Sequence, residues 1–303
     1  MVKIVFLILN FKNMDETEKC VASILGCNFL NYEIVIVDNG SADGSAQKMH
    51  DLYDDNKFIH VVESKENVGF SKGNNLGYQF IRDNIDADFV VVTNNDVLFP
   101  QKDFDQRIAE VYRDTQFHIL GPDIFVRAKK IHQSPLALNM PTLFQIKKEL
   151  AMYEYYERHP QKWVRRRTLQ NIKNRFCQKF KCFGWLCSLF KGGDTINPLK
   201  AYKDCCVQGA CIIISKKFLK SEKKMFSPEP FLFCEEMLLY KKCKEKKYKI
   251  VYEPSIQIWH EDSSTMKIVN KNNLGKAQFT LKHHVRARRM LVEVWESTNG
   301  TDV

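Results

Sequence analysis

The sequence of 303 residues lacks the short motifs that identify several common classes of protein. Its ten cysteines include no Cys-x-x-Cys pair, which argues against a zinc knuckle or a dithiol redox centre. No apolar run approaches the ~20 residues that a membrane-spanning helix needs. There is also no internal repeat and no low-complexity tract. These absences leave a globular protein that is not transmembrane.

Glycine is missing where two nucleotide-binding classes require it. The loop after the first expected strand reads "NFKN", without the Gly-x-Gly-x-x-Gly turn of a dinucleotide-binding domain. The Gly-x-x-x-x-Gly-Lys-Ser/Thr loop of nucleoside triphosphatases is absent as well. A ligand of this chain must therefore be held by side chains.

The cysteines and the N-terminus indicate a reducing compartment. Several cysteines lie in apolar runs, such as Cys211 in "GACIIIS", where a thiol acts as a small hydrophobic group. The N-terminal apolar run is short, ends at Asn10 and precedes no small-residue cleavage site. We expect a first strand rather than a signal peptide, reduced thiols and a cytoplasmic location.

The overall charge indicates an anionic partner. The formal net charge is +10 and the calculated pI is about 9.0. A positive net charge of this size favours binding to nucleic acid, to a phosphorylated substrate or to an anionic membrane surface, and it does not distinguish these three partners.

Strands and helices alternate through the first 125 residues. Continuous apolar runs predict strands at 3–9, 33–38, 58–63 and 89–92. Helical spacing predicts helices at 15–25, 45–53, 71–84 and 103–114. This order predicts an α/β fold, a parallel sheet with helices on both faces and a ligand beyond the carboxyl ends of the strands. Asn94, Asn95 and Asp96 follow such a strand, either as a turn or as a ligand site.

Five stretches in order resemble the inverting family 2 glycosyltransferases. They are "LILNFKN", "VDNGSADGS", "ENVGFSKGNNLG", "NNDV" and "FLFCEEMLLYKKC…YEPSIQIWH". The chain looks most like the rhamnosyltransferase-like branch that builds bacterial surface polysaccharides. The resemblance implies a GT-A fold: a Rossmann-like, mostly parallel sheet flanked by helices, with a basic helical insertion and a helical C-terminus.

The resemblance also assigns a nucleotide-sugar site. Asp38 would accept the N3 hydrogen of uracil or thymine, and Asn10 would border the base or ribose. The remaining residues expected to support the base or contact the nucleotide and diphosphate are Asn39, Ser41, Asn67, Gly69, Lys72, Asn74 and Asn95. Each stretch also has a purely structural interpretation. Asn10 would be a strand end, Asp43 and Ser45 would be helix N-cap residues, and "ENVGFSKGNNLG" would be a glycine-rich turn into a helix.

The same resemblance implies a metal site and a catalytic base. Asp96 would bind Mn²⁺ or Mg²⁺ in an Asp-x-Asp motif whose first position is Asn94, and His260 would be a second ligand that favours Mn²⁺. Glu236, where the family usually has Asp, would take the proton of the acceptor hydroxyl, with Glu235 as a possible exchange. The alternative is two acids that complement a helix dipole.

Residues Gln208 and Gly209 resemble the acceptor-side loop of the family. With them, the resemblance suggests four segments: a nucleotide-sugar half at 1–129, a basic insertion at 130–200, an acceptor and catalytic half at 201–265 and a helical segment at 266–303.

The basic insertion has no family motif. Residues 158–191 hold ten Lys or Arg and no Asp or Glu, interleaved with aromatic residues. Three interpretations stay open: a solvated helical hairpin, an element bound to an anionic membrane surface, and a single-strand nucleic-acid binder. We expect no nucleic acid, because no RNA-binding fold is visible.

The expected activity is transfer of a hexosyl or rhamnosyl group, with inversion, from a UDP- or dTDP-sugar. The expected acceptor is a capsule or O-antigen type glycan, polyprenyl-linked, at the inner face of the cytoplasmic membrane. A catalytically silent sugar-nucleotide-binding or membrane-scaffold protein is the alternative. A nucleotidyltransferase would need a glycine-rich triphosphate loop that this chain lacks.

Overall fold

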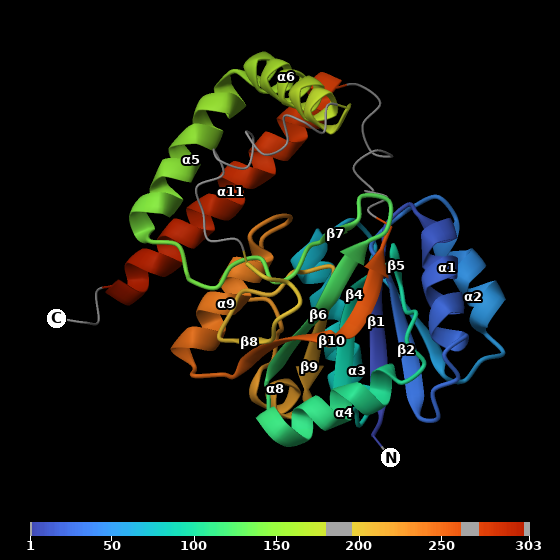
Figure 1. Ribbon diagram of the computed structural model, residues 1–303. Helices are drawn as coiled ribbons and strands as arrows, with labels where there is room; N and C mark the ends of the chain where they lie inside the picture. Colours follow the sequence, from blue (N-terminus) through green and yellow to red (C-terminus); the bar gives the residue numbers. More distant parts are fainter. Residues whose placement is uncertain (1, 180–195, 262–272, 300–303) are drawn as a thin grey trace. The chain divides into compact units, whose positions relative to one another are not determined.

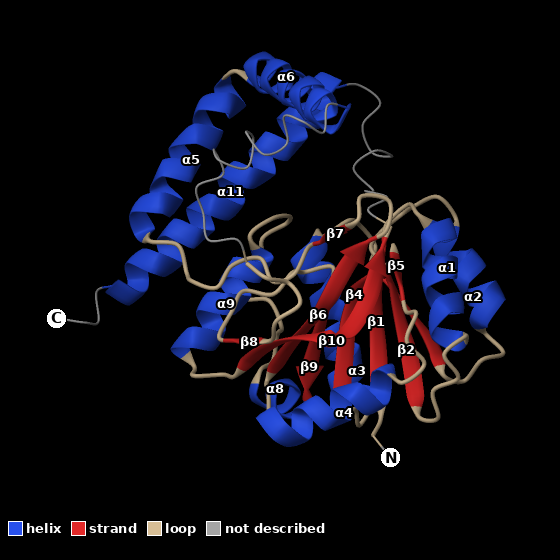
Figure 2. Ribbon diagram, viewed as in Figure 1, coloured by secondary structure: helices blue, strands red, loops and turns tan. Residues whose placement is uncertain are grey.

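The computed structural model describes residues 2–179, 196–261 and 273–299, and the chain divides into two compact units. The sheet unit comprises residues 1–141 and 198–268, and the helical unit comprises residues 142–197 and 269–303. Figure 1 shows the order of the elements along the chain, and Figure 2 shows that all strands belong to the sheet unit.

The sheet unit is built on one mixed sheet with the strand order β3-β2-β1-β4-β9-β6-β10-β5, to which β7 and β8 add at β6 and β10. The first four strands are parallel, and so are β6 and β10, whereas β9 is antiparallel to both of its neighbours. The strands are β1 (Ile4–Asn10), β2 (Tyr32–Asp38), β3 (Ile59–Glu63), β4 (Phe89–Asn94), β5 (Val97–Leu98), β6 (Ile119–Val126), β7 (Ile131–His132), β8 (Tyr202–Lys203), β9 (Cys211–Ser215) and β10 (Ile250–His260).

Both faces of this sheet are covered, which explains its continuous apolar strands. Phe6 and Ile8 of β1 pack into one core layer, while Val5 and Leu7 pack into the other. A Cβ atom on Gly77 would lie 2.2 Å from a Leu7 methyl group, so glycine allows its helix to approach the sheet closely. The helices of this unit are α1 (Met14–Leu25), α2 (Ser45–Tyr53), α3 (Phe70–Asn84), α4 (Phe104–Thr115), α8 (Lys216–Ser221) and α9 (Glu235–Glu245).

The buried cysteines of this unit act as hydrophobic groups. Cys20 and Cys211 have no exposed surface, and burial raises the pKa of the Cys243 thiol to about 12. A thiol with such a pKa stays protonated and unreactive at neutral pH.

The polypeptide leaves and re-enters the sheet unit at one place. Ala137 and Cys206 form an isolated antiparallel bridge, in which the Cys206 N–H donates to the Ala137 carbonyl at 2.8 Å. The Leu136 N–H donates to the Cys206 carbonyl, also at 2.8 Å. The two ends of the interval between them are therefore held side by side.

The helical unit consists of α5 (Leu143–Arg158), α6 (Pro160–Lys179) and α11 (Asn273–Asn299). Ion pairs join α5 to α11, since Arg288 and Arg289 contact Glu149 and Glu154 at 3.0 and 2.8 Å. The basic run continues into residues 180–191, which lie outside the described residues. Within the described part of the chain, no helix is both long and apolar enough to cross a bilayer.

Candidate active site

Asp38 lies at the carboxyl end of β2, where its carboxylate is almost fully buried. Its Oδ1 atom accepts hydrogen bonds from the Asn10 amide and from the Ser41 and Ser45 hydroxyls. Its Oδ2 atom accepts one from the Ser41 N–H at 3.0 Å. The surrounding donors fix the orientation of this carboxylate, and one lone pair of Oδ2 is left for a further donor.

Asn10 and Asn95 are joined through a third residue, Thr17 of α1. The Thr17 hydroxyl donates to Asn10 Oδ1 at 2.9 Å and accepts from the Asn95 amide at 3.0 Å. The Asn95 amide also donates to the Asn13 carbonyl. The ends of β1, β2 and β4 are thus connected by one buried polar network.

Asn39 holds the glycine-rich loop in place. Its amide group donates to Asn67 Oδ1 and to the Gly69 carbonyl, both at 3.2 Å, and its Oδ1 accepts from the Val68 N–H. Gly40 next to it has φ +68°, and a Cβ atom there would lie 2.2 Å from the Glu66 carbonyl carbon. Asn39 therefore supports the loop, since its amide atoms are occupied by backbone and side-chain partners.

The first five residues of α3 include Ser71, Lys72 and Asn74. Lys72 is exposed, whereas Ser71 and Asn74 are buried. Asn74 donates to the Phe70 carbonyl at 3.0 Å. Its Oδ1 atom and the Ser71 Oγ atom are buried and accept no hydrogen bond from the described residues. These atoms are placed at the start of a helix, where backbone N–H groups favour anions.

Asp96 and His260 meet at the junction of β4, β5 and β10. Both side chains are buried, and His260 Nε2 lies 3.2 Å from Asp96 Oδ1. The backbone of Asp96 is fixed by the Glu261 N–H, which donates to its carbonyl at 2.9 Å. The other ring nitrogen of His260, Nδ1, lies 2.7 Å from Gln133 Oε1.

The donor set of Asp96 and His260 fits a divalent cation. Two ligand atoms about 2.1 Å from one octahedral ion lie about 3.0 Å apart, close to the spacing of these two atoms. Within residues 2–179, 196–261 and 273–299 no group of three or more His, Cys, Asp or Glu could hold a metal. A cation here would complete its shell with water and substrate oxygens, as Mg²⁺ and Mn²⁺ commonly do.

The acid pair Glu235 and Glu236 begins α9. Burial and the neighbouring Glu236 raise the pKa of Glu235 well above its ordinary value, and Glu235 Oε2 accepts no hydrogen bond from the described residues. Burial also raises the pKa of Glu236, while the Gly209 N–H, 3.2 Å from Glu236 Oε1, acts in the opposite direction. Glu236 is the more exposed of the two side chains.

A strained turn positions this acid pair. Phe233 and Cys234, directly before α9, have φ values of +72° and +65°, which are rare for residues other than glycine. The Phe70 N–H donates to the Phe231 carbonyl at 2.7 Å, so the turn is anchored to the start of α3. Backbone strain of this kind is concentrated at functional sites.

A short path of contacts connects the acid pair to β4, the strand that precedes Asp96. Gly209 contacts Glu236, and the next residue, Ala210, accepts hydrogen bonds through its carbonyl from the Asn94 N–H at 2.9 Å and the Thr93 hydroxyl at 3.2 Å. Gln208 accepts from the Ala210 N–H. The predicted acceptor-side residues thus lie between the predicted base and the predicted metal ligand.

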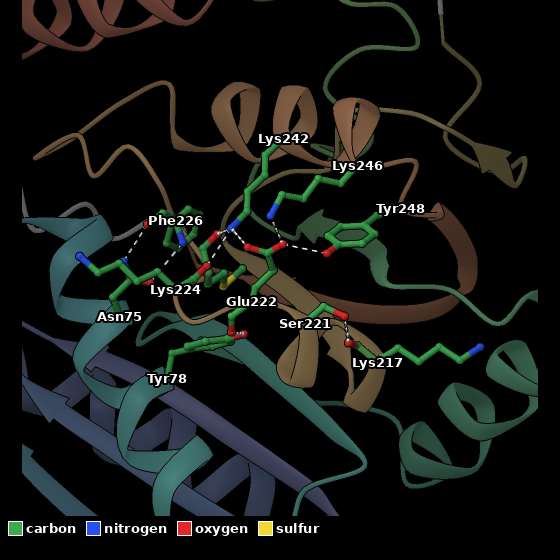
Figure 3. A network of polar contacts seen from close by, with 11 residues as sticks. Asn75, Tyr78, Lys217, Ser221, Glu222, Lys224, Phe226, Lys242, Lys246 and Tyr248 are labelled. Atoms are coloured by element: carbon green, nitrogen blue, oxygen red, sulfur yellow. Dashed lines mark hydrogen bonds and ion pairs between the residues drawn. The ribbon is translucent and has the colours of Figure 1, made fainter.

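The segment before the acid pair is held by a second network (Figure 3). Glu222 accepts hydrogen bonds from Lys246 and Tyr248 through Oε1 and contacts Lys242 Nζ at 2.8 Å. Tyr78 of α3 donates to the Glu222 carbonyl, and Asn75 donates to the Phe226 carbonyl. This network fixes the segment between α8 and α9 against α3.

Two functional candidates were missed from the sequence. Thr17 was assigned only to a helix, and Gln133 was assigned no role. A buried hydroxyl on a helix that follows a strand ending in Asn is a weak signal for Thr17. No local signal identifies Gln133, because its partner His260 is distant in the sequence.

The mixed α/β sheet flanked by helices is the fold of the GT-A glycosyltransferases. The family model for glycosyl transferase family 2 matches residues 6–182, more than half of the chain, and the chain belongs to this family. The low-salt glycan biosynthesis hexosyltransferase Agl10 of Haloferax volcanii is 28% identical over 130 residues. This match covers 43% of the chain and 39% of that relative's length.

Solved structures support the same fold. The crystal structure of residues 1–349 of TarS from S. aureus has a TM-score of 0.52 at 12% identity, covering 97% of this chain and 70% of that one. The complex of the same fragment with UDP gives 0.51 at 13% identity, with coverage of 85% and 60%. The α/β fold expected from the sequence is confirmed.

Proposed function

We propose that the chain is a metal-dependent, inverting transferase that moves a hexosyl group from a UDP- or dTDP-sugar to a surface-polysaccharide acceptor. The contact between Asp96 and His260 carries this proposal, because two buried ligand atoms at that spacing suit a cation that binds a diphosphate. The UDP bound by the TarS fragment of similar fold supports a nucleotide donor.

Asp38 would select the base. The remaining lone pair of its Oδ2 atom can accept the N3 hydrogen of uracil or thymine, and cytosine has no such hydrogen. Because Asn10, Ser41 and Ser45 already hold the other oxygen, the carboxylate is oriented before the donor binds. The Ser71 hydroxyl and the first turn of α3 would face the phosphates.

Glu236 would act as the base. A buried acid pair resists double ionisation, so a proton held on Glu235 leaves Glu236 as the carboxylate. The Gly209 N–H stabilises that carboxylate. Glu236 takes the proton from the acceptor hydroxyl as its oxygen attacks the anomeric carbon, and the bond from that carbon to the diphosphate breaks on the opposite face. A cation on Asp96 and His260 would neutralise charge on the departing diphosphate.

The acceptor is proposed to be lipid-linked, with the enzyme bound to an anionic membrane surface. The acids of α5 at Glu149 and Glu154 are paired with arginines of α11. Arg165, Arg166 and Arg167 of α6 are exposed, and among the described residues none of them contacts a carboxylate. Uncompensated cations of this kind attract anionic headgroups.

Calorimetric titration with UDP, dTDP, GDP and CDP, with and without Mn²⁺, tests the proposal. We expect UDP or dTDP to bind only when Mn²⁺ is present.

Glu236→Gln should bind the same nucleotide as tightly but transfer sugar about 10²- to 10⁴-fold more slowly, the usual contribution of a general base. Normal transfer by this variant would rule out Glu236, and absence of binding to all four nucleotides would favour a catalytically silent scaffold.

A further inference from the structure

His260 presents an imbalance of hydrogen-bond partners. Both ring nitrogens face oxygen atoms, Asp96 Oδ1 at 3.2 Å and Gln133 Oε1 at 2.7 Å. A neutral imidazole carries a hydrogen on only one nitrogen. One of the two contacts therefore places a nitrogen lone pair against an oxygen lone pair, unless a positive charge is shared there.

The shorter contact indicates which nitrogen carries the hydrogen. An amide oxygen only accepts, so Gln133 Oε1 requires a hydrogen on Nδ1. The lone pair of Nε2 is then directed toward the Asp96 carboxylate, and two ligand atoms converge on one point. This is the usual arrangement of a metal-bound histidine, whose second nitrogen donates to a carbonyl or carboxylate.

Hydrogen bonds of its backbone and of the neighbouring residues hold Gln133 in a fixed position. Its own N–H donates to the Ile124 carbonyl of β6 at 2.8 Å. The preceding His132 contacts the buried Asp123 carboxylate at 2.8 Å, and Gln257 of β10 donates to the other Asp123 oxygen at 2.9 Å. The loop after β7 is thus fixed to β6 and β10, the strand that ends in His260.

We propose that Gln133 is a positioning residue that sets the tautomer of His260, so that Nε2 and Asp96 together form a binding site with two protein ligands for a divalent cation. This inference rests on the metal dependence proposed above. In this role Gln133 would act through His260, its hydrogen-bond partner, rather than on the substrate or the cation.

The first test is made on the metal-free protein and needs no activity. Long-range ¹H–¹⁵N correlation spectra of the full chain, labelled at its eight histidines, distinguish the two tautomers, and His260→Ala assigns the signal. We expect the hydrogen on Nδ1 of His260. A hydrogen on Nε2 would overturn the inference, because the ring would then donate to Asp96, whether Nδ1 accepts from the Gln133 amide group or also carries a hydrogen in a positively charged ring.

Variants supply the second test, with Mn²⁺ binding in the presence of UDP followed by electron paramagnetic resonance. Gln133→Leu should weaken Mn²⁺ binding by about 10- to 100-fold, the usual effect of losing such a partner. Gln133→Glu, which only accepts, should keep wild-type affinity or exceed it. The control Gln47→Leu, on the exposed face of α2, should leave affinity unchanged.

The outcomes separate the two proposals. Equal Mn²⁺ affinity in wild type and Gln133→Leu would overturn the role of Gln133 and leave the metal site intact. Equal losses in both Gln133 variants would also overturn it, since they would indicate packing rather than hydrogen-bond acceptance. Absence of Mn²⁺ binding in the wild type would instead remove the metal from the proposed function, and with it this role of Gln133.

Discussion

Gly209 shows how closely the acid site is packed. A Cβ atom at this position would lie 2.8 Å from Glu236 Oε1 and 3.2 Å from its carboxyl carbon. A larger residue here would therefore displace the Glu236 carboxylate, and the reason for glycine is this approach rather than a left-handed backbone. The same residue supplies the N–H that the carboxylate accepts.

We predict that Gly209→Ala lowers kcat by about 10- to 100-fold, because a displacement of roughly 1 Å is enough to misalign a catalytic group. The affinity for UDP should stay unchanged, since the nucleotide network does not contain Gly209. Steady-state kinetics and calorimetry measure the two quantities. Gly26→Ala at the end of α1 is the matched control, and a loss of nucleotide binding in Gly209→Ala would contradict the assignment.

Residue identity alone predicted some of the site and missed other parts. Asp96, His260, Glu236 and Gly209 were singled out from short motifs, and the fold places them in two contacting pairs. Asn39 was expected to support nucleotide recognition, which stays a prediction; the motif did not reveal that its amide atoms hold the loop at Asn67 and Gly69. Hydrogen-bond partners depend on three-dimensional placement, which a motif does not specify.

At the level of secondary-structure elements, Glu222 is the residue whose side-chain contacts join the segment after α8 to α9. Burial raises the pKa of this carboxyl, but hydrogen bonds from Lys242, Lys246 and Tyr248 together lower it below its ordinary value of 4.5. A lowered pKa in the folded state stabilises the fold at pH values above 4.5. That stabilisation is lost as the pH falls through the lowered pKa.

We predict that Glu222→Gln lowers the free energy of unfolding at neutral pH by about 2 kcal/mol. The estimate lies below the range for a fully buried pair because Lys246 is half exposed. The difference from wild type should shrink well below pH 4.5, and urea denaturation at both pH values measures it. Lys217→Ala, an exposed lysine of the same region, is the control; a constant difference at both pH values would exclude the charge effect.

The sequence predicted the early elements better than the later ones. The periodic strands and helices of the first 115 residues lie within one or two residues of their expected positions. Strand β6 was missed, because "ILGPDIFV" contains glycine and proline, which weaken a strand pattern. Strand β10 extends from Ile250 to His260, past a shift in register between Glu253 and Gln257, and the proline within it weakens the strand pattern in the same way.

At the scale of the whole molecule, charge is distributed unevenly between helices. Arg166 donates to the Tyr156 hydroxyl at 2.8 Å and Arg167 lies over the Trp163 ring, so both guanidinium groups contact aromatic rather than acidic partners. Their positive charge is therefore available to an anionic surface.

We predict that replacing Arg165, Arg166 and Arg167 by Gln weakens binding to anionic vesicles by about 100-fold, at roughly 1 kcal/mol for each charge. Binding of UDP should be unaffected. Co-sedimentation with vesicles of defined anionic lipid content measures the effect. Replacing Lys216, Lys224 and Lys241, which form ion pairs in the sheet unit, makes the same change in net charge. Equal losses in both triple variants would indicate a dependence on net charge alone.

The bridge between Ala137 and Cys206 has a consequence for how such enzymes diversify. Because the two ends of the intervening segment are joined by backbone hydrogen bonds, its helices α5 and α6 can change in length and sequence while β8 stays paired with β10 and the register of the sheet is kept. The entropy of closing a loop grows only slowly with its length, so long and short replacements cost nearly the same. The sheet unit can therefore serve as a constant frame that accommodates helical segments of different length.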